Sequence, residues 1–231
     1  MPDDGPLFVH FSLYKLDPSW RRLPPEVKDQ NKDDTHGVLE KWADRFAIMP
    51  YTLLGLRGDA DILLWKFSER VEDFQGFASS FLTTGLGSYL NTPYAYLAMT
   101  RRSKYVGGHD DKGGHGSTAK LEPLGAPYLM IYPFVKTDEW YQLPFEERKR
   151  MMGEHFRIGH KYPNVKIHTT YSYGLDDQEF VLAFETGDLE DFLNLVEALR
   201  FTEARKYTLR DTPIFTCLAV PDFRTLLDAF G

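Results

Sequence analysis

The chain has 231 residues, of which 42% are hydrophobic and 26% charged, and its formal net charge at pH 7 is −7. The negative charge argues against a general nucleic-acid or anionic-membrane surface, and the single cysteine, Cys217, excludes an intrachain disulfide. No stretch approaches the roughly 20 apolar residues of a membrane span, and the acidic start "MPDDGPLFVHF" lacks the basic region of a signal peptide. We therefore expect a soluble cytoplasmic protein with no nucleic-acid partner and no membrane span.

The first half of the chain begins with an apolar, alternating run at Leu7, Val9, Phe11 and Tyr14, which predicts a strand. The phrase "KLDPSWRRLP" (15–24) ends this strand and leads into a charged stretch with helical spacing. Hydrophobic periodicity then predicts two strands around a glycine turn, a helix and a last strand, at 51–56, 61–67, 70–85 and 93–100.

Residues 103–126 are rich in glycine and have almost no apolar periodicity. Such a segment predicts an exposed, mobile linker that folds over a site.

The second half repeats the phrases of the first at a nearly constant offset. "KTDEWYQLP" (136–144) matches "KLDPSWRRLP", "DLEDF" (188–192) matches "RVEDF" (70–74), and "TPIFTCLA" (212–219) matches "TPYAYLA" (92–98). The elements predicted around these phrases are strands at 128–136, 167–173, 179–184 and 213–219, a helix after Pro144 and a helix at 188–201.

Each half therefore has the order β-α-β-β-α-β, which is that of a ferredoxin-like unit. We predict an α+β fold of tandem ferredoxin-like repeats with antiparallel sheets packed face to face, of the dimeric α+β barrel type. The predicted domains are a structural N-terminal half (1–102), the linker (103–126) and a ligand-binding C-terminal half (127–231).

The strand "YLMIYPFVK" (128–136) carries the first candidate site residues. A period of two places Tyr132, Phe134 and Lys136 on one face. A lysine at the end of an apolar strand usually extends to water, but beside a tyrosine it could hold an anionic ligand such as a carboxylate. Pro133 cannot donate a ladder hydrogen bond, which suggests an edge or a bulge.

Two histidines, His155 and His160, lie on the helix after Pro144. They fall on opposite shoulders of the apolar stripe centred on Met152, and periodicity favours His155 only slightly. A helical histidine at the edge of a core face is more often a hydrogen-bonded structural residue than a ligand, so the residues alone leave both roles open.

The stretch "YPFVKTDEWYQLPFEERKRMMGEHFRIGHKY" (132–162) resembles the chlorite dismutase-like haem protein family, most closely its coproheme decarboxylase branch. The shared pattern is Tyr-Pro-x-x-Lys, Trp-Tyr-x-Leu-Pro, x-Glu-Glu-Arg and a helical Glu-His. "GLDDQEF" (174–180) and "ALRFTEARKY" (198–207) are also similar to that family, and the resemblance covers nearly the whole chain.

The resemblance implies a role for each matching residue. His155 would be the proximal ligand of the haem iron, Tyr132 the tyrosine that becomes the oxidising radical, and Lys136 the residue that holds a propionate. The porphyrin edge would be lined by Pro133, Phe134 and Val135, and Thr212 would lie near a propionate. A neutral ligand histidine needs a hydrogen-bonding partner, for which we expect a carboxylate among Asp176, Asp177 and Glu179.

One position departs from the family pattern. Ile167 stands where relatives carry a glutamine or arginine over the iron, which argues against chlorite as the substrate.

The function that the resemblance implies is the conversion of Fe-coproporphyrin III (coproheme) to haem b by hydrogen-peroxide-dependent oxidative decarboxylation. The alternatives are a haem-binding protein with weak peroxidase, catalase or residual chlorite dismutase activity, and an oligomer that has lost its haem site. The resemblance also implies a homopentamer and transient contact with a ferrochelatase.

Overall fold

The computed structural model describes residues 5–105 and 121–231, and the predicted linker lies mostly outside these ranges. The described chain forms two compact units. One consists mainly of residues 98–216 and is called the 98–216 unit; the other consists of residues 7–97 with 217–231 and is called the 7–97 unit. The predicted domains 1–102 and 127–231 stay predictions.

The 7–97 unit is built on antiparallel strand pairs. β1 (Phe8–Leu16) pairs with β3 (Ile62–Ser68), and β3 pairs with β2 (Ala47–Thr52). The remaining strand residues belong to β4 (Leu90–Met99) and β9 (Phe215–Ala219), whose Leu218 and Ala219 pair with β2. The helical elements are η1 (Pro18–Arg22), α1 (Pro25–Ala43), α2 (Val71–Phe81), η2 (Gly87–Tyr89) and α6 (Phe223–Asp228).

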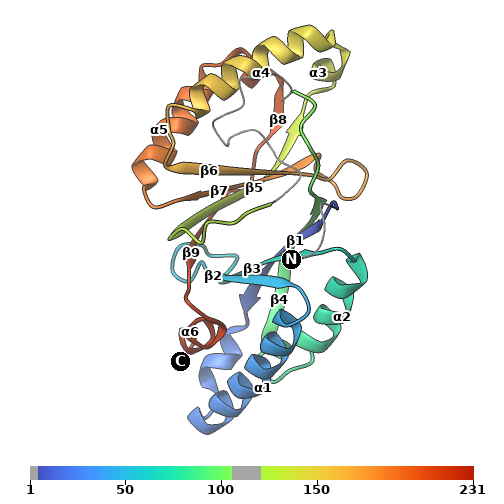
Figure 1. The fold of residues 1–231 in the computed structure, drawn as a ribbon. Coiled ribbons are helices and arrows are strands. Elements are labelled where there is room, and N and C mark those ends of the chain that lie inside the picture. Colours follow the sequence, from blue (N-terminus) through green and yellow to red (C-terminus); the bar gives the residue numbers. More distant parts are fainter. Residues whose placement is uncertain (1–4, 106–120) are drawn as a thin grey trace. The chain divides into compact units, whose positions relative to one another are not determined.

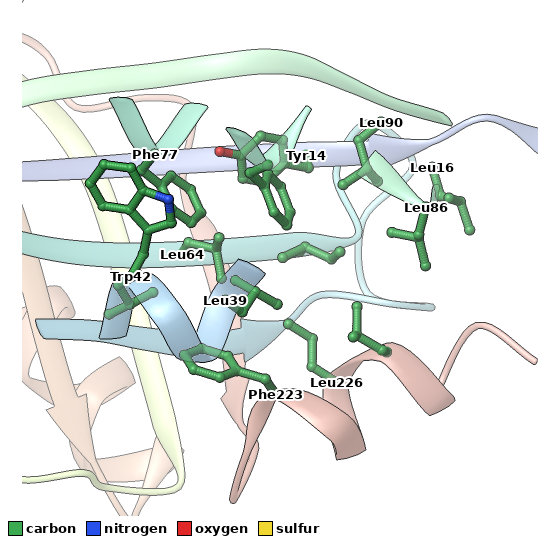
Figure 2. Close-up of a cluster of buried hydrophobic side chains, with 14 of the residues drawn as sticks. Tyr14, Leu16, Leu39, Trp42, Leu64, Phe77, Leu86, Leu90, Phe223 and Leu226 are labelled. Atoms are coloured by element: carbon green, nitrogen blue, oxygen red, sulfur yellow. The ribbon is translucent and has the colours of Figure 1, made fainter. Parts of the chain in front are cut away.

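Aromatic and aliphatic side chains fill the space between the helices and strands of this unit. Trp42 from α1 and Phe77 from α2 meet Tyr14 and Leu64 from the strands, and Phe223 from α6 closes the cluster (Figure 2). These residues are all buried, so the helices are held by apolar contact with one strand face.

The 98–216 unit has a second antiparallel arrangement (Figure 1). β7 (Phe180–Thr186) pairs with both β5 (Tyr128–Lys136) and β6 (Val165–Tyr171), and β8 (Thr208–Arg210) pairs with the end of β5. Its helical elements are α3 (Asp138–Gln142), α4 (Phe145–Gly159), α5 (Leu189–Arg200) and η3 (Glu203–Tyr207). α4 and α5 lie across one strand face and pack on it through Ile158 and Leu195.

The predicted α+β class is confirmed, and the predicted elements are present with ends shifted by a few residues. The repeated phrase has one structural meaning in both units. Trp20 and Trp140 are buried in short helical turns, and Pro24 and Pro144 then stand at the N-caps of α1 and α4. Proline is suited to a helix start because an N–H group at that position would have no acceptor within the helix. The relation of the units as ferredoxin-like repeats, and barrel closure, stay predictions.

Both glycine turns foreseen between paired strands need a glycine. Gly55 and Gly174 have φ values of +79° and +70°, a conformation that other residues rarely adopt.

A buried carboxylate anchors the backbone that leads into β5. The side chain of Glu185 accepts hydrogen bonds from the N–H groups of Leu124 and Gly125, both at 2.8 Å. It also lies 2.7 Å from Nε2 of His168. These hydrogen bonds keep the pKa of Glu185 below its ordinary value even though burial opposes its charge.

Within the described residues no helix is long and apolar enough to cross a membrane.

Lys66 is a buried cation in the 7–97 unit. Its Nζ donates to Oγ of Ser12 at 2.8 Å and lies 4.8 Å from the ring centroid of Phe77. The described residues offer it no ion pair, and burial lowers its pKa to about 7.

We expect the free energy of unfolding to rise between about pH 7 and about pH 10, because the unfolded chain binds a proton at Lys66 that the folded chain lacks. Lys66→Met should remove this component, whose slope approaches about 1.4 kcal/mol per pH unit. Urea unfolding over this pH range measures it, with exposed Lys41→Met as the control. Equal slopes in wild type and the Lys66 variant would contradict the expectation.

Candidate functional site: a basic, aromatic cavity

A cavity of about 220 Å³ lies within the 98–216 unit. Its walls come from one face of β5, β6 and β7, from α4 and α5, and from the segments 101–105 and 202–211. Most of the lining is apolar or aromatic, so the cavity can enclose a largely hydrophobic ligand.

Strand alternation decides which residues of β5 reach the cavity. Tyr132, Phe134 and Lys136 line it, as the period of two predicts, whereas Pro133 and Val135 do not. The register shifts between Val135 and Lys136, where β5 leaves β7 and pairs with β8. Pro133 itself stays in regular register opposite Val181, so the irregularity lies beyond it along β5.

Tyr132 is a buried phenol with 9% of its surface exposed. Its ring stacks on Phe184, with the centroids 5.5 Å apart. Burial raises the pKa of Tyr132 strongly, and the negative charge of Asp211 adds to the effect. The hydroxyl therefore keeps its proton throughout the physiological range.

Lys136 turns into the protein rather than toward water. Its Nζ donates to the carbonyl oxygen of Ala204 at 3.1 Å and lies 4.4 Å from the ring centroid of Trp140. Its backbone N–H donates to Oε2 of Glu179 at 2.7 Å. Burial, with repulsion from Arg205, lowers the pKa of Lys136 to about 8, so its amine can gain or lose a proton near neutral pH.

His155 on α4 lines the cavity, whereas His160 is exposed at the end of the helix and does not. Burial lowers the pKa of His155 to about 4, and the charge of Lys136 adds to the shift. The imidazole is therefore neutral at physiological pH and has a lone pair to offer.

The expected carboxylate partner of His155 is not found. Among the described residues, no hydrogen bond joins His155 to Asp176, Asp177 or Glu179. Glu179 instead holds the backbone of Lys136, and Asp176 accepts from the side chain of Gln178. Glu179 and Asp176 thus serve local backbone and turn contacts in this structure, and the hydrogen-bonding partner of His155 stays a prediction.

The two remaining predicted residues, Ile167 and Thr212, differ in whether they line the cavity. Ile167 on β6 lines the cavity and presents an apolar side chain. Thr212 is exposed and is not part of the lining, while Thr208 and Asp211 are. The contact of Thr212 with a propionate stays a prediction.

An ion-pair group in the cavity wall was missed by the sequence analysis. Nη1 of Arg200 and Nη1 of Arg205 both donate to Oδ2 of Asp211, at 2.7 and 2.6 Å. One carboxylate thus faces two guanidinium groups, and the group keeps a net positive charge. The only sequence signal was the cluster of basic residues in "ALRFTEARKYTLRD" (198–211).

Further basic side chains line the cavity from another segment: Arg101, Arg102 and Lys104. With Lys136 and the arginine pair, they make the cavity electropositive although the whole chain is negative. Such a lining favours a ligand with several carboxylates.

The side chains around the cavity indicate a bound group that itself supplies most of the ligands to its metal ion. Among the described residues there is no cluster of three or more His, Cys, Asp or Glu side chains that could hold a metal ion. A single neutral histidine, aromatic walls and basic side chains fit a planar metalloporphyrin with acidic arms instead.

Comparison with known proteins agrees with this site. The family model for chlorite dismutase matches residues 28–220. A coproheme decarboxylase from Mycolicibacterium smegmatis is 37% identical over 187 residues, covering 80% of this chain and 78% of that protein. The chain belongs to the chlorite dismutase family, a family of haem enzymes.

Solved structures show the same fold. A mutant chlorite dismutase from Candidatus Nitrospira defluvii superposes with a TM-score of 0.90 at 28% identity, over 100% of this chain and 97% of that one. A putative chlorite dismutase, TA0507, has a TM-score of 0.80 at 22% identity, over 98% of this chain and 100% of that one. The second likeness supports the fold alone.

The two buried lysines give a direct test of this electrostatic description. We expect NMR of lysine-labelled protein without ligand to show one amine titrating near pH 8, from Lys136, and another near pH 7, from Lys66. Lys136→Met should remove the first resonance and Lys66→Met the second. If the resonance removed by Lys136→Met or by Lys66→Met titrates only at the ordinary lysine pKa of about 10.4, the assignment is contradicted.

Proposed function

We propose that this protein converts coproheme to haem b by oxidative decarboxylation of two propionate arms, with hydrogen peroxide as the oxidant. The observation that carries the proposal is a buried, protonated tyrosine, Tyr132, in a basic cavity that also contains one neutral histidine, His155. The relative from M. smegmatis, named as a coproheme decarboxylase, supports the same activity.

The balance of the reaction defines what the site must handle. Each propionate becomes a vinyl group and carbon dioxide, and it gives up two electrons and one proton. Peroxide takes the two electrons with two protons and leaves as two molecules of water. Each step therefore consumes one proton overall, together with one negative charge.

When bound, the iron porphyrin supplies the centre at which peroxide is reduced. His155 would hold the iron through its neutral ring nitrogen. Tyr132, once its phenolic hydrogen is lost, would take a hydrogen atom from a propionate arm. Because the phenol is buried and protonated, it does not lose this hydrogen to bulk base.

Lys136, Arg200 and Arg205 would hold the propionate carboxylates, and they line the same cavity as Tyr132. The charges of Asp211, Arg200 and Arg205 act on the phenol of Tyr132. A lysine whose pKa is about 8 can also deliver the proton that each step consumes.

Ile167 favours a second candidate, a haem-binding protein with only incidental peroxidase or catalase activity. An apolar side chain on this wall gives no polar group to help cleave peroxide. Mass spectrometry of the porphyrin after peroxide addition separates the two functions. Loss of two carboxyl groups supports the decarboxylase, and bleaching alone supports the second candidate.

We expect His155→Ala to leave the fold intact and to shift the visible spectrum of bound coproheme, because the ligand to the iron is lost. Binding of coproheme should weaken by about tenfold or more, which corresponds to a binding free energy of about 1.4 kcal/mol. His160→Ala should change neither property because His160 lies outside the cavity. Absorption titrations measure both variants. Retention of the wild-type spectrum by the His155 variant would refute its role as the ligand.

We expect Tyr132→Phe to bind coproheme with wild-type affinity but to form no haem b, because the ring is kept and the abstractable hydrogen is lost. Chromatography of the extracted porphyrin after peroxide addition measures the product. Tyr128→Phe, on the same strand but outside the cavity lining, is the matched control. Undiminished turnover in the Tyr132 variant would exclude the radical role.

A further inference from the structure

Two tyrosine hydroxyls meet at the edge of the cavity. The Oη atoms of Tyr141 on α3 and Tyr173, in the segment between β6 and β7, lie 3.0 Å apart. Their rings are 6.2 Å apart in an edge-to-face arrangement. Tyr173 lines the cavity and is also 44% exposed, so one ring borders both the cavity and the protein surface.

A carboxylate lies near this pair. Burial, and after it the carboxylate of Glu179, raises the pKa of the Tyr141 phenol. Glu179 cannot move freely, because it also accepts the backbone N–H of Lys136 and donates its own to the carbonyl of Phe134. A phenol that is hydrogen-bonded to a carboxylate can lose an electron and pass its proton across in the same step.

Aromatic rings connect the pair with the interior of the cavity. Tyr173 packs 5.1 Å from Phe180 and 6.5 Å from Tyr171, and both partners line the cavity. These centroid distances lie within the usual range for interacting aromatic rings. An oxidising equivalent in the cavity therefore has a short aromatic path to Tyr173 and Tyr141.

We propose that Tyr141 and Tyr173 form a surface oxidation site, at which phenols and related aromatic one-electron donors are oxidised without entering the cavity. The inference rests on the proposed function only for the supply of oxidising equivalents from peroxide.

In each transfer a tyrosine gives one electron to the centre in the cavity, and the phenolic proton of Tyr141 passes to Glu179 and then to solvent, while the peroxide takes up one proton from solvent for each electron. A donor phenol then restores the tyrosine by giving up a hydrogen atom. The sum over two transfers is one hydrogen peroxide and two phenols yielding two waters and two phenoxyl radicals.

The activity test uses haem-loaded protein, peroxide and 2,6-dimethoxyphenol. Tyr141→Phe should lower kcat/KM for the phenol by about tenfold, while the yield of haem b from coproheme stays that of wild type. Tyr94→Phe is the matched control, because its hydroxyl also donates to a carboxylate, Asp59, at 2.7 Å, but Tyr94 belongs to the 7–97 unit and does not line this cavity. Equal phenol oxidation by Tyr141→Phe and wild type overturns the proposal, and so does an equal fall in both activities.

A second readout needs no donor. When peroxide is added alone, the tyrosine pair should couple, and peptide mass spectrometry should find residues 141 and 173 linked with the loss of two hydrogens. The link should be absent in Tyr141→Phe and in Tyr173→Phe, and 2,6-dimethoxyphenol should suppress it. Its absence from oxidised wild-type protein overturns the proposal.

The proposed function and the surface oxidation site can be refuted independently of each other. Phenol oxidation and the cross-link without haem b would remove the decarboxylase function and leave the surface site. Should the protein bind no haem, photo-oxidation of the unloaded chain with a ruthenium tris-bipyridyl complex and persulfate replaces peroxide. The link between Tyr141 and Tyr173 is then expected above all other tyrosine pairs, and a link no more abundant than others counts against the site.

Discussion

The pairing of β5 with β7 sets the positions of Tyr132, Phe134 and Lys136 in the cavity wall. The ladder runs from Tyr128 opposite Thr186 to Phe134 opposite Phe180, and Glu179 continues it by binding the backbone at both Phe134 and Lys136. A slip of one residue would turn Tyr132 and Lys136 away from the cavity and bring Pro133 and Val135 into it. The chemistry of the site therefore depends first on backbone register and only then on side-chain identity.

The two units differ in what lies between their helices and strands. Both lay helices over one face of antiparallel strands, and each buries a tryptophan before the first long helix. In the 7–97 unit, Trp42, Phe74 and Phe77 occupy the space between helix and strand. In the 98–216 unit that space stays open and is bordered by polar side chains, and burial lowers the pKa values of Lys136 and His155.

The sequence was sufficient for the features that repeat locally. Period-two alternation identified the cavity face of β5, and the helical angle favoured His155 over His160, although only slightly. The remaining contacts join segments that no periodicity relates, such as Arg200 with Asp211, or Tyr141 with Tyr173. We expected Glu179 near His155. Its carboxylate instead accepts a hydrogen bond from the backbone N–H of Lys136, where the strand register shifts. Which donor binds a given acceptor depends on the distances between segments in the folded chain. The spacing of residues in the sequence does not contain this information.

Lys136 is anchored twice and independently, through its backbone N–H to Glu179 and through its amine to the carbonyl of Ala204. The backbone contact does not depend on which side chain position 136 carries. A substitution at position 136 can therefore change the charge in the cavity wall while the backbone contact that positions the strand is kept.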